Sequence, residues 1–141
     1  MIVYFDTSAF VPLLVTEPGT PLAGELWVSA DEVVTTRLLY VEAAAALARA
    51  RRMGRITARN WRAAVDSLDD LWRDFRVIEV DEVVTRRAAE LADRYALRGY
   101  DAVHCACAER IEAPDLVVAG GDKDLMAACA ELALATALIG Q

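Results

Sequence analysis

The chain has 141 residues, of which 56% are hydrophobic and 26% are charged, and its formal net charge at pH 7 is -7. One hydrophobic core commonly serves roughly 100 to 200 residues, so we expect one domain over residues 1-141, and the apolar content excludes a disordered chain. The negative charge argues against a general nucleic-acid binder, because contacts to phosphate normally come from basic surfaces.

Three features bear on where the protein acts. The sequence reaches a charge at Asp6 without a basic leader, which predicts no ordinary secretory signal. The apolar stretch from Leu125 to Ile139 is interrupted by Glu131 and is shorter than the roughly 20 residues that span a bilayer. The cysteines lack CxxC spacing and fit reduced, buried thiols. We therefore expect a cytoplasmic protein with no membrane segment.

Short apolar runs that resemble buried strands alternate with helical stretches along the chain. In chain order the predicted strands are Ile2–Phe5, Val33–Thr35, Val77–Val80, Leu116–Ala119 and Thr136–Ile139. The predicted helices are Ser8–Val15, Pro21–Ala30, Arg37–Met53, Thr57–Phe75, Asp81–Tyr95, Asp101–Ile111 and Lys123–Leu134. This alternation implies an α/β fold, a three-layer α/β/α domain around a central parallel sheet of about five strands. Ligands bind beyond the carboxyl ends of such strands.

Three aspartates lie at junctions of this predicted pattern. Asp6 follows the first strand, Asp122 follows the fourth strand and the pair Gly120-Gly121, and Asp101 opens the helix after Gly99-Tyr100. Each of them, taken alone, fits a helix cap equally well. Because the strand ends of a parallel sheet gather at one edge, the alternative is that these side chains form part of one site.

Glu42 differs from these aspartates because it lies inside an apolar, alanine-rich helix. A charge there must be paired or bind a metal, since burying it alone costs several kcal/mol. Carboxylates about 4 Å apart repel by roughly 4 kcal/mol at an effective dielectric near 20, so a cluster of them takes up protons or cations. Oxygen-only ligands favour Mg²⁺ or Mn²⁺ over zinc.

Several motifs in order resemble the PIN-domain ribonucleases, and within them the VapC toxins of bacterial toxin-antitoxin pairs. The similarity runs nearly end to end. It is carried by Asp6-Thr7-Ser8-Ala9, by Glu17-Pro18-Gly19, by Glu42 on its alanine-rich helix, by Leu97-Arg98-Gly99-Tyr100-Asp101-Ala102-Val103-His104 and by Asp122-Lys123-Asp124-Leu125. The resemblance implies a PIN-like fold.

The resemblance also implies roles for the acids. Asp6, Glu42, Asp101 and Asp122 would form the catalytic quartet, with Asp6 and Asp101 as the direct ligands of Mg²⁺ or Mn²⁺. Ser8 would hold a water of the ion. One departure affects the fourth position: Gly120-Gly121 stands where many relatives have Thr or Ser, and Asp124 is a second candidate for that acid.

The activity implied by the resemblance is metal-dependent hydrolysis of RNA phosphodiester bonds by an endoribonuclease, leaving 5′-phosphate and 3′-hydroxyl ends. The implied partners are the RNA substrate, a neutralising cognate antitoxin and a second copy of the chain in a homodimer. Six arginines between Arg49 and Arg62 fit either a surface that contacts RNA or a solvated helix face.

Two other functions remain open from the sequence. A phosphoacceptor receiver domain is also a small α/β unit with a late lysine, here Lys123, but it needs paired acids after the first strand, where this chain has only Asp6. A catalytically silent PIN-like domain could instead bind RNA or a partner.

His104, one turn after Asp101, is expected to pack in the core or orient that carboxylate rather than act as a base.

Overall fold

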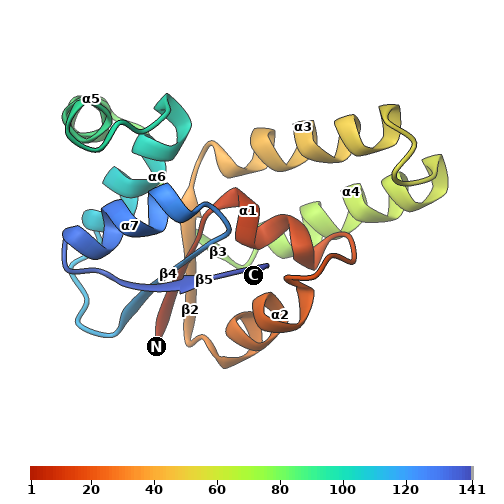
Figure 1. Ribbon diagram of the computed structural model, residues 1–141. Helices are drawn as coiled ribbons and strands as arrows, with labels where there is room; N and C mark the ends of the chain where they lie inside the picture. Colours follow the sequence, from red (N-terminus) through yellow and green to blue (C-terminus); the bar gives the residue numbers. More distant parts are fainter. Residues whose placement is uncertain (141) are drawn as a thin grey trace.

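The computed structural model describes residues 1–140, and in it the strands form a central sheet with helices on both sides (Figure 1). The strands are β1 Ile2–Phe5, β2 Glu32–Thr36, β3 Phe75–Ile78, β4 Leu116–Gly120 and β5 Ala135–Leu138. The helices are α1 Thr7–Phe10, α2 Thr20–Ser29, α3 Leu39–Arg52, α4 Ala58–Trp72, α5 Glu82–Tyr95, α6 Gly99–Glu109 and α7 Lys123–Glu131, with a short 3₁₀ helix at Val11–Leu13.

The sheet has five parallel strands in the order β3-β2-β1-β4-β5. The chain moves outward in one direction from β1 and in the other from β4, and these two strands are neighbours, with Phe5 paired to Ala119. In open α/β sheets this reversal leaves a crevice at the carboxyl ends of the two strands. The order also excludes a receiver domain, whose strands follow the order 2-1-3-4-5.

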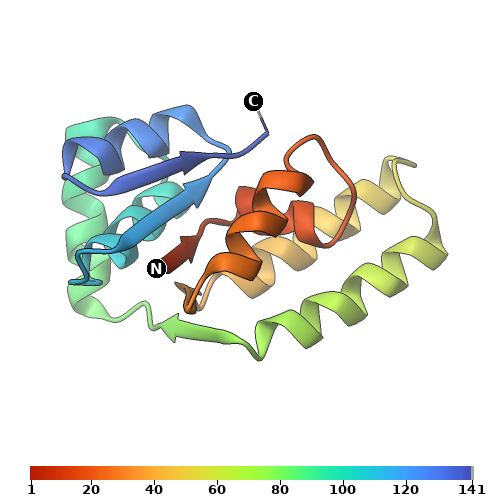
Figure 2. The same cartoon turned by 90° about the horizontal axis from the view of Figure 1, so that it is seen from below.

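Alternating side chains of the central strands divide the core into two layers. Val3 and Phe5 on β1 pack with α1 to α4, whereas Tyr4 packs with α5, α6 and α7 on the opposite face. The period of two in a strand makes this division unavoidable. Figures 1 and 2 show α3 and α4 running away from the sheet as a pair. The predicted three-layer α/β/α fold is confirmed.

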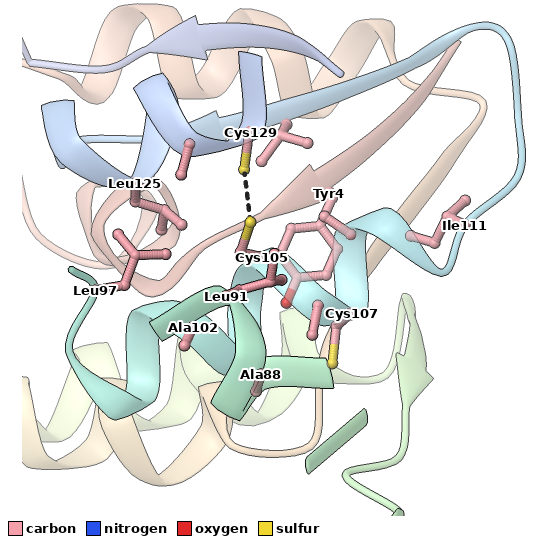
Figure 3. Packing of buried hydrophobic residues seen from close by; sticks show 14 of the residues in the cluster. Tyr4, Ala88, Leu91, Leu97, Ala102, Cys105, Cys107, Ile111, Leu125 and Cys129 are labelled. Carbon is pink, nitrogen blue, oxygen red and sulfur yellow. Dashed lines mark hydrogen bonds between the residues drawn. The ribbon is translucent and has the colours of Figure 1, made fainter. Parts of the chain in front are cut away.

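The layer under α5, α6 and α7 is packed with small and aliphatic side chains around Tyr4 (Figure 3). All three cysteines are free and buried, and the sulfur atoms of Cys105 on α6 and Cys129 on α7 are 3.8 Å apart. The sulfurs therefore fill space between these two helices in the way that small apolar groups do.

Two predicted helices are wrong in extent for identifiable reasons. The sequence predicts a helix that extends to Phe75, but the helix ends at Trp72 and Phe75 begins β3. There it packs edge-on against Phe10 and Trp27, so tertiary contacts override the local pattern. The predicted helix Ser8–Val15 is split near Pro12 into α1 and the 3₁₀ turn, since proline has no N–H to continue the ladder.

Asp101 does not open its helix, contrary to the prediction from the sequence. Helix α6 begins at Gly99, so Asp101 lies within the first turn, and the cap residue Arg98 makes no side-chain capping bond. The remaining predicted bounds differ from the structure by a few residues at the ends. Among residues 1–140, none of the helices is both long enough and apolar enough to cross a bilayer.

Candidate active site

Asp6 lies at the carboxyl end of β1, where the sheet reverses direction. Its carboxylate accepts a hydrogen bond from the backbone N–H of Thr7 at 2.7 Å and another from the hydroxyl of Ser8. The residue is only 4% exposed. Asp6 therefore caps α1, as one interpretation of the sequence expected, and it also lines the pocket in this crevice.

Glu42 reaches the same place from α3. Its Oε1 lies 2.8 Å from Nε2 of His104 and accepts a hydrogen bond from the Thr7 hydroxyl at 3.0 Å. The same His104 nitrogen is 3.3 Å from Oδ1 of Asp6, and the opposite ring nitrogen is 2.8 Å from the Tyr4 hydroxyl. The buried imidazole of His104 thus contacts the carboxylates of both Asp6 and Glu42.

The environment of His104 favours its charged form. Burial by itself lowers the pKa of this imidazole, but the carboxylates of Asp6 and Glu42 raise the pKa above its ordinary value. The expectation that His104 packs in the core holds, since it is 1% exposed. The expectation that it orients Asp101 is wrong, because its hydrogen-bond partners are Tyr4, Thr7 and Glu42.

The other two acids meet at a single arginine. Arg98 donates from Nε to Asp101 at 3.0 Å and from a terminal nitrogen to Asp122 at 3.3 Å. Burial raises the pKa of Asp101, and the guanidinium of Arg98 opposes that rise. The hydrogen bond with Asp101 in turn raises the pKa of Arg98. Asp122 also caps α7 by accepting from the N–H of Leu125 at 2.9 Å.

These four acids line one open pocket of about 440 Å³. Its walls also include Ser8, Glu17 and Arg98. Asp124, the second candidate for the fourth acid, instead lines a separate hollow with Tyr95 and Ala96. The structure therefore brings Asp122, and not Asp124, to the other three acids.

The two glycines before Asp122, at the end of β4 and directly after it, make room for this pocket. A Cβ on Gly120 would lie 3.2 Å from Oδ2 of Asp6 and 2.6 Å from the end of Met126. A Cβ on Gly121 would lie 3.3 Å from Oγ of Ser8, which accepts the Gly121 N–H at 2.7 Å. Because neither residue has a side chain, the backbone itself lies against Asp6 and Ser8.

The donor set suits a hard divalent cation. Carboxylate and hydroxyl oxygens are the ligands that Mg²⁺ and Mn²⁺ prefer, and the lining of the pocket contains no cysteine or histidine. As the side chains stand, no three Asp, Glu, His or Cys residues within 1–140 are grouped closely enough to hold a metal. Arg98 supplies a positive charge beside Asp101 and Asp122, which is where a cation would be favoured.

Sequence reasoning missed the residues that hold the acids in place. Arg98 could have been found, because it precedes Asp101 by three residues and such pairs face each other in a helix. The contacts of Thr7 with Glu42 and of Tyr4 with His104 join residues 35 and 100 positions apart. Spacing alone has no signal for contacts of that kind.

Comparison with known proteins agrees with this geometry. The family model of the PIN domain matches residues 3–131. Ribonucleases VapC45 and VapC49 of Mycobacterium tuberculosis are each 44% identical to the chain over 124 residues, covering 88% of the chain and 86% of the relative. The crystal structure of VapC20 from M. tuberculosis, described as a sarcin-ricin loop cleaving toxin, superposes with a TM-score of 0.69 at 24% identity, covering 89% and 94% of the two chains.

The match to VapC20 supports only the fold, because the sequence identity is 24%. The family-model match spans most of the chain, and the identity to the two ribonucleases extends over most of both sequences. The chain therefore belongs to the PIN domain family, within its VapC group.

Proposed function

We propose that the chain is a metal-dependent endoribonuclease that hydrolyses RNA phosphodiester bonds and acts as the toxin of a toxin-antitoxin pair. The observation that most supports this proposal is the convergence of Asp6, Glu42, Asp101 and Asp122 on one pocket at the reversal of the sheet. The identity to two proteins named as ribonucleases supports the same reaction.

We assign the cation to Asp6 and Asp101, with Mg²⁺ or Mn²⁺ as the ion and with Glu42 and Asp122 binding its water shell or a second ion. A divalent cation supplies a water of lowered pKa and neutralises charge that develops on the phosphate. The inference to these metals rests on the oxygen-only donors of the pocket. No 2′-hydroxyl is needed in this chemistry, so preference for RNA must come from substrate shape.

The residues of the chain act mainly by holding the acids in fixed positions. The N–H of Thr7 and the hydroxyl of Ser8 fix both oxygens of Asp6. His104 and the Thr7 hydroxyl fix the carboxylate of Glu42. Groups that are already oriented before the substrate arrives do not have to reorganise during the reaction, which is the main source of electrostatic catalysis.

We further propose that a cognate antitoxin restrains this activity in the cytoplasm and that the chain forms a homodimer. A pocket lined by acids, in a chain of net charge -7, attracts a basic segment of a partner. Toxin-antitoxin assemblies are among the solved structures that share the fold, which supports the proposal by analogy only. A peptide from the protein encoded beside this chain should stop cleavage at saturation, and unchanged rates would refute this regulation.

The experiment that tests the nuclease proposal is cleavage of RNA by the purified chain with Mg²⁺ or Mn²⁺, with EDTA as the metal-free control. The matched variant is Asp6→Asn, whose amide oxygen still accepts the Thr7 N–H. We expect cuts by the wild type only, with 5′-phosphate ends when the fragments are sequenced. RNA binding without cuts under both metals would favour the silent PIN-like alternative.

A further inference from the structure

Arg98 stands apart from the other residues at this edge of the sheet. It lines the acidic pocket and also an adjoining, more apolar hollow of about 600 Å³ that includes Leu38, Tyr100 and Val103. Among residues 1–140, it is the one basic residue in the lining of either hollow. Any polyanion that enters meets carboxylates and this single guanidinium.

The contacts that hold the guanidinium are exchangeable. Arg98 bridges Asp101 and Asp122 at 3.0 and 3.3 Å, yet its side chain is 80% exposed. Such exposed ion pairs contribute little to stability, because water screens them and side-chain entropy opposes them. The backbone of Arg98 is anchored by its carbonyl, which accepts the Ala102 N–H at 2.9 Å, so the side chain can turn while its base stays fixed.

A divalent cation held by Asp101 would compete with the Arg98 guanidinium for the negative charge of Asp101 and Asp122. Asp101 is one of the proposed metal ligands, and Asp122 lines the same pocket, so an ion bound there neutralises the charge that Arg98 otherwise neutralises. Arg98 then loses its partners without leaving the rim. Its planar fork of five donors matches the non-bridging oxygens of a phosphate in a bidentate way.

We propose that Arg98 is an exchangeable internal cation and the substrate-binding residue of this site: it pairs with Asp101 and Asp122 in the cation-free protein and turns to a phosphate of the RNA when a divalent cation occupies the carboxylates. The inference rests on the proposed nuclease function and names the group that receives the polyanion. It answers the difficulty raised by the net charge of -7, since a phosphate entering an acidic pocket needs a positive partner at its rim.

The first test measures cation binding without RNA. Mn²⁺ is titrated into wild type and Arg98→Ala and followed by electron paramagnetic resonance, with Arg94→Ala as the control. Arg94 is an exposed arginine on α5 outside both hollows, so this variant has the same change in net charge. We expect Arg98→Ala to bind Mn²⁺ several-fold more tightly than wild type or Arg94→Ala, because the guanidinium that competes with the cation has been removed. Unchanged or weaker binding overturns the proposal.

The second test measures the interaction with RNA at fixed Mg²⁺. For Arg98→Ala we expect KM for a short single-stranded RNA to rise about tenfold, because a charge-assisted contact to phosphate is lost. The slope of log KM against log salt should fall by about 0.7, the value for one phosphate contact on a single strand. Arg98→Lys should recover part of the affinity and most of the salt slope, and Arg94→Ala should match wild type.

The two tests separate this inference from the function on which it rests. If the wild type cleaves RNA and Arg98→Ala has the same KM and the same salt slope, the role of Arg98 is refuted while the nuclease function stands. If the wild type cleaves no RNA with either metal, the proposed function fails, and the Mn²⁺ titration still decides whether Arg98 competes with a cation. Equal thermal midpoints of the three arginine variants would establish that the differences are local.

Discussion

His104 lies 2.8 Å from the carboxylate of Glu42, although 62 residues separate the two in the chain. This contact ties α6 to α3 across the end of β1, and the second ring nitrogen is anchored on Tyr4 inside the core. Hydrophobic packing thus fixes an imidazole, and the imidazole fixes a carboxylate of the candidate active site. Stability and activity are therefore coupled at this position.

Replacing His104 by Ala should lower both the stability of the fold and the rate of RNA cleavage. Glu42 would keep only the Thr7 hydroxyl as a donor, and a partly buried charge would lose its partner. We expect the free energy of unfolding to fall by about 1–3 kcal/mol and cleavage to fall roughly 10- to 100-fold, as for other residues that orient ligands. Urea unfolding and single-turnover cleavage measure the two effects. His104→Gln, which restores a donor, should recover part of the rate; wild-type cleavage by His104→Ala would show that Glu42 needs no such support.

Asp122 and Asp124 form a matched pair for the fourth acid. Asp122→Asn keeps the acceptor for the Leu125 N–H and so preserves the cap of α7, but it removes a charge from the acidic pocket. We expect cleavage to fall roughly tenfold or more, with little change in thermal midpoint. Asp124→Asn, in the other hollow, should cleave like wild type. A loss confined to Asp124→Asn would reverse the assignment.

Gly120 offers a test of the space beside Asp6. In Gly120→Ala the new methyl would press on the flexible end of Met126 and come within 3.2 Å of Oδ2 of Asp6. Because the methionine can move and the carboxylate is fixed by Thr7 and Ser8, we expect activity to fall more than stability. Cleavage rates and thermal unfolding, measured on the same preparation, compare the two. Equal rates for variant and wild type would mean that the methyl is accommodated away from Asp6.

Leu125 tests the core beneath the site. It is fully buried in the layer formed by α5, α6 and α7 (Figure 3). Leu125→Ala should lower the free energy of unfolding by about 2–5 kcal/mol, through lost burial and a residual cavity. Val83→Ala on α5 is the control, because Val83 is 66% exposed; its effect should stay within about 0.5 kcal/mol. Chemical denaturation measures both.

Asp81 should make stability depend on pH in the acid range. The hydrogen bond from the Val84 N–H and the ion pair with Arg110 lower the pKa of this carboxyl in the folded protein. The unfolded chain has an Asp pKa of about 3.9, and the pKa of Asp81 in the folded protein lies below it. The ionised carboxylate therefore stabilises the fold fully above the unfolded pKa, and this stabilisation is lost as pH falls through the folded pKa. Urea midpoints of wild type and Asp81→Asn should therefore differ near neutral pH and converge in acid. Arg110→Gln should reduce the same dependence; a constant difference at every pH would exclude this origin.

The class of fold could be predicted from the amino-acid pattern alone, and the resemblance to PIN-domain ribonucleases predicted which acids would form the site. Short apolar runs between helical stretches predicted every strand of the sheet and the three-layer arrangement, because parallel strands covered by helices on both faces consist of nearly continuous apolar residues. Asp6 and Asp122 were placed at strand ends by the same pattern. Prediction failed where local spacing was ambiguous, as at Phe75, which fits the helix pattern but packs as a strand residue.

The assembly of the site depends on contacts between elements that lie far apart in the chain. The strand order places β1 beside β4, and that adjacency brings Asp6 and Asp122 to one pocket while Asp124 turns to another. The pairing of His104 with Glu42, and the bridge from Arg98 to Asp122, join elements whose distance along the chain carries no signal. Periodicity reports which face of an element is buried, but which faces meet depends on packing over the whole molecule, and the electrostatics of this site follow from that packing.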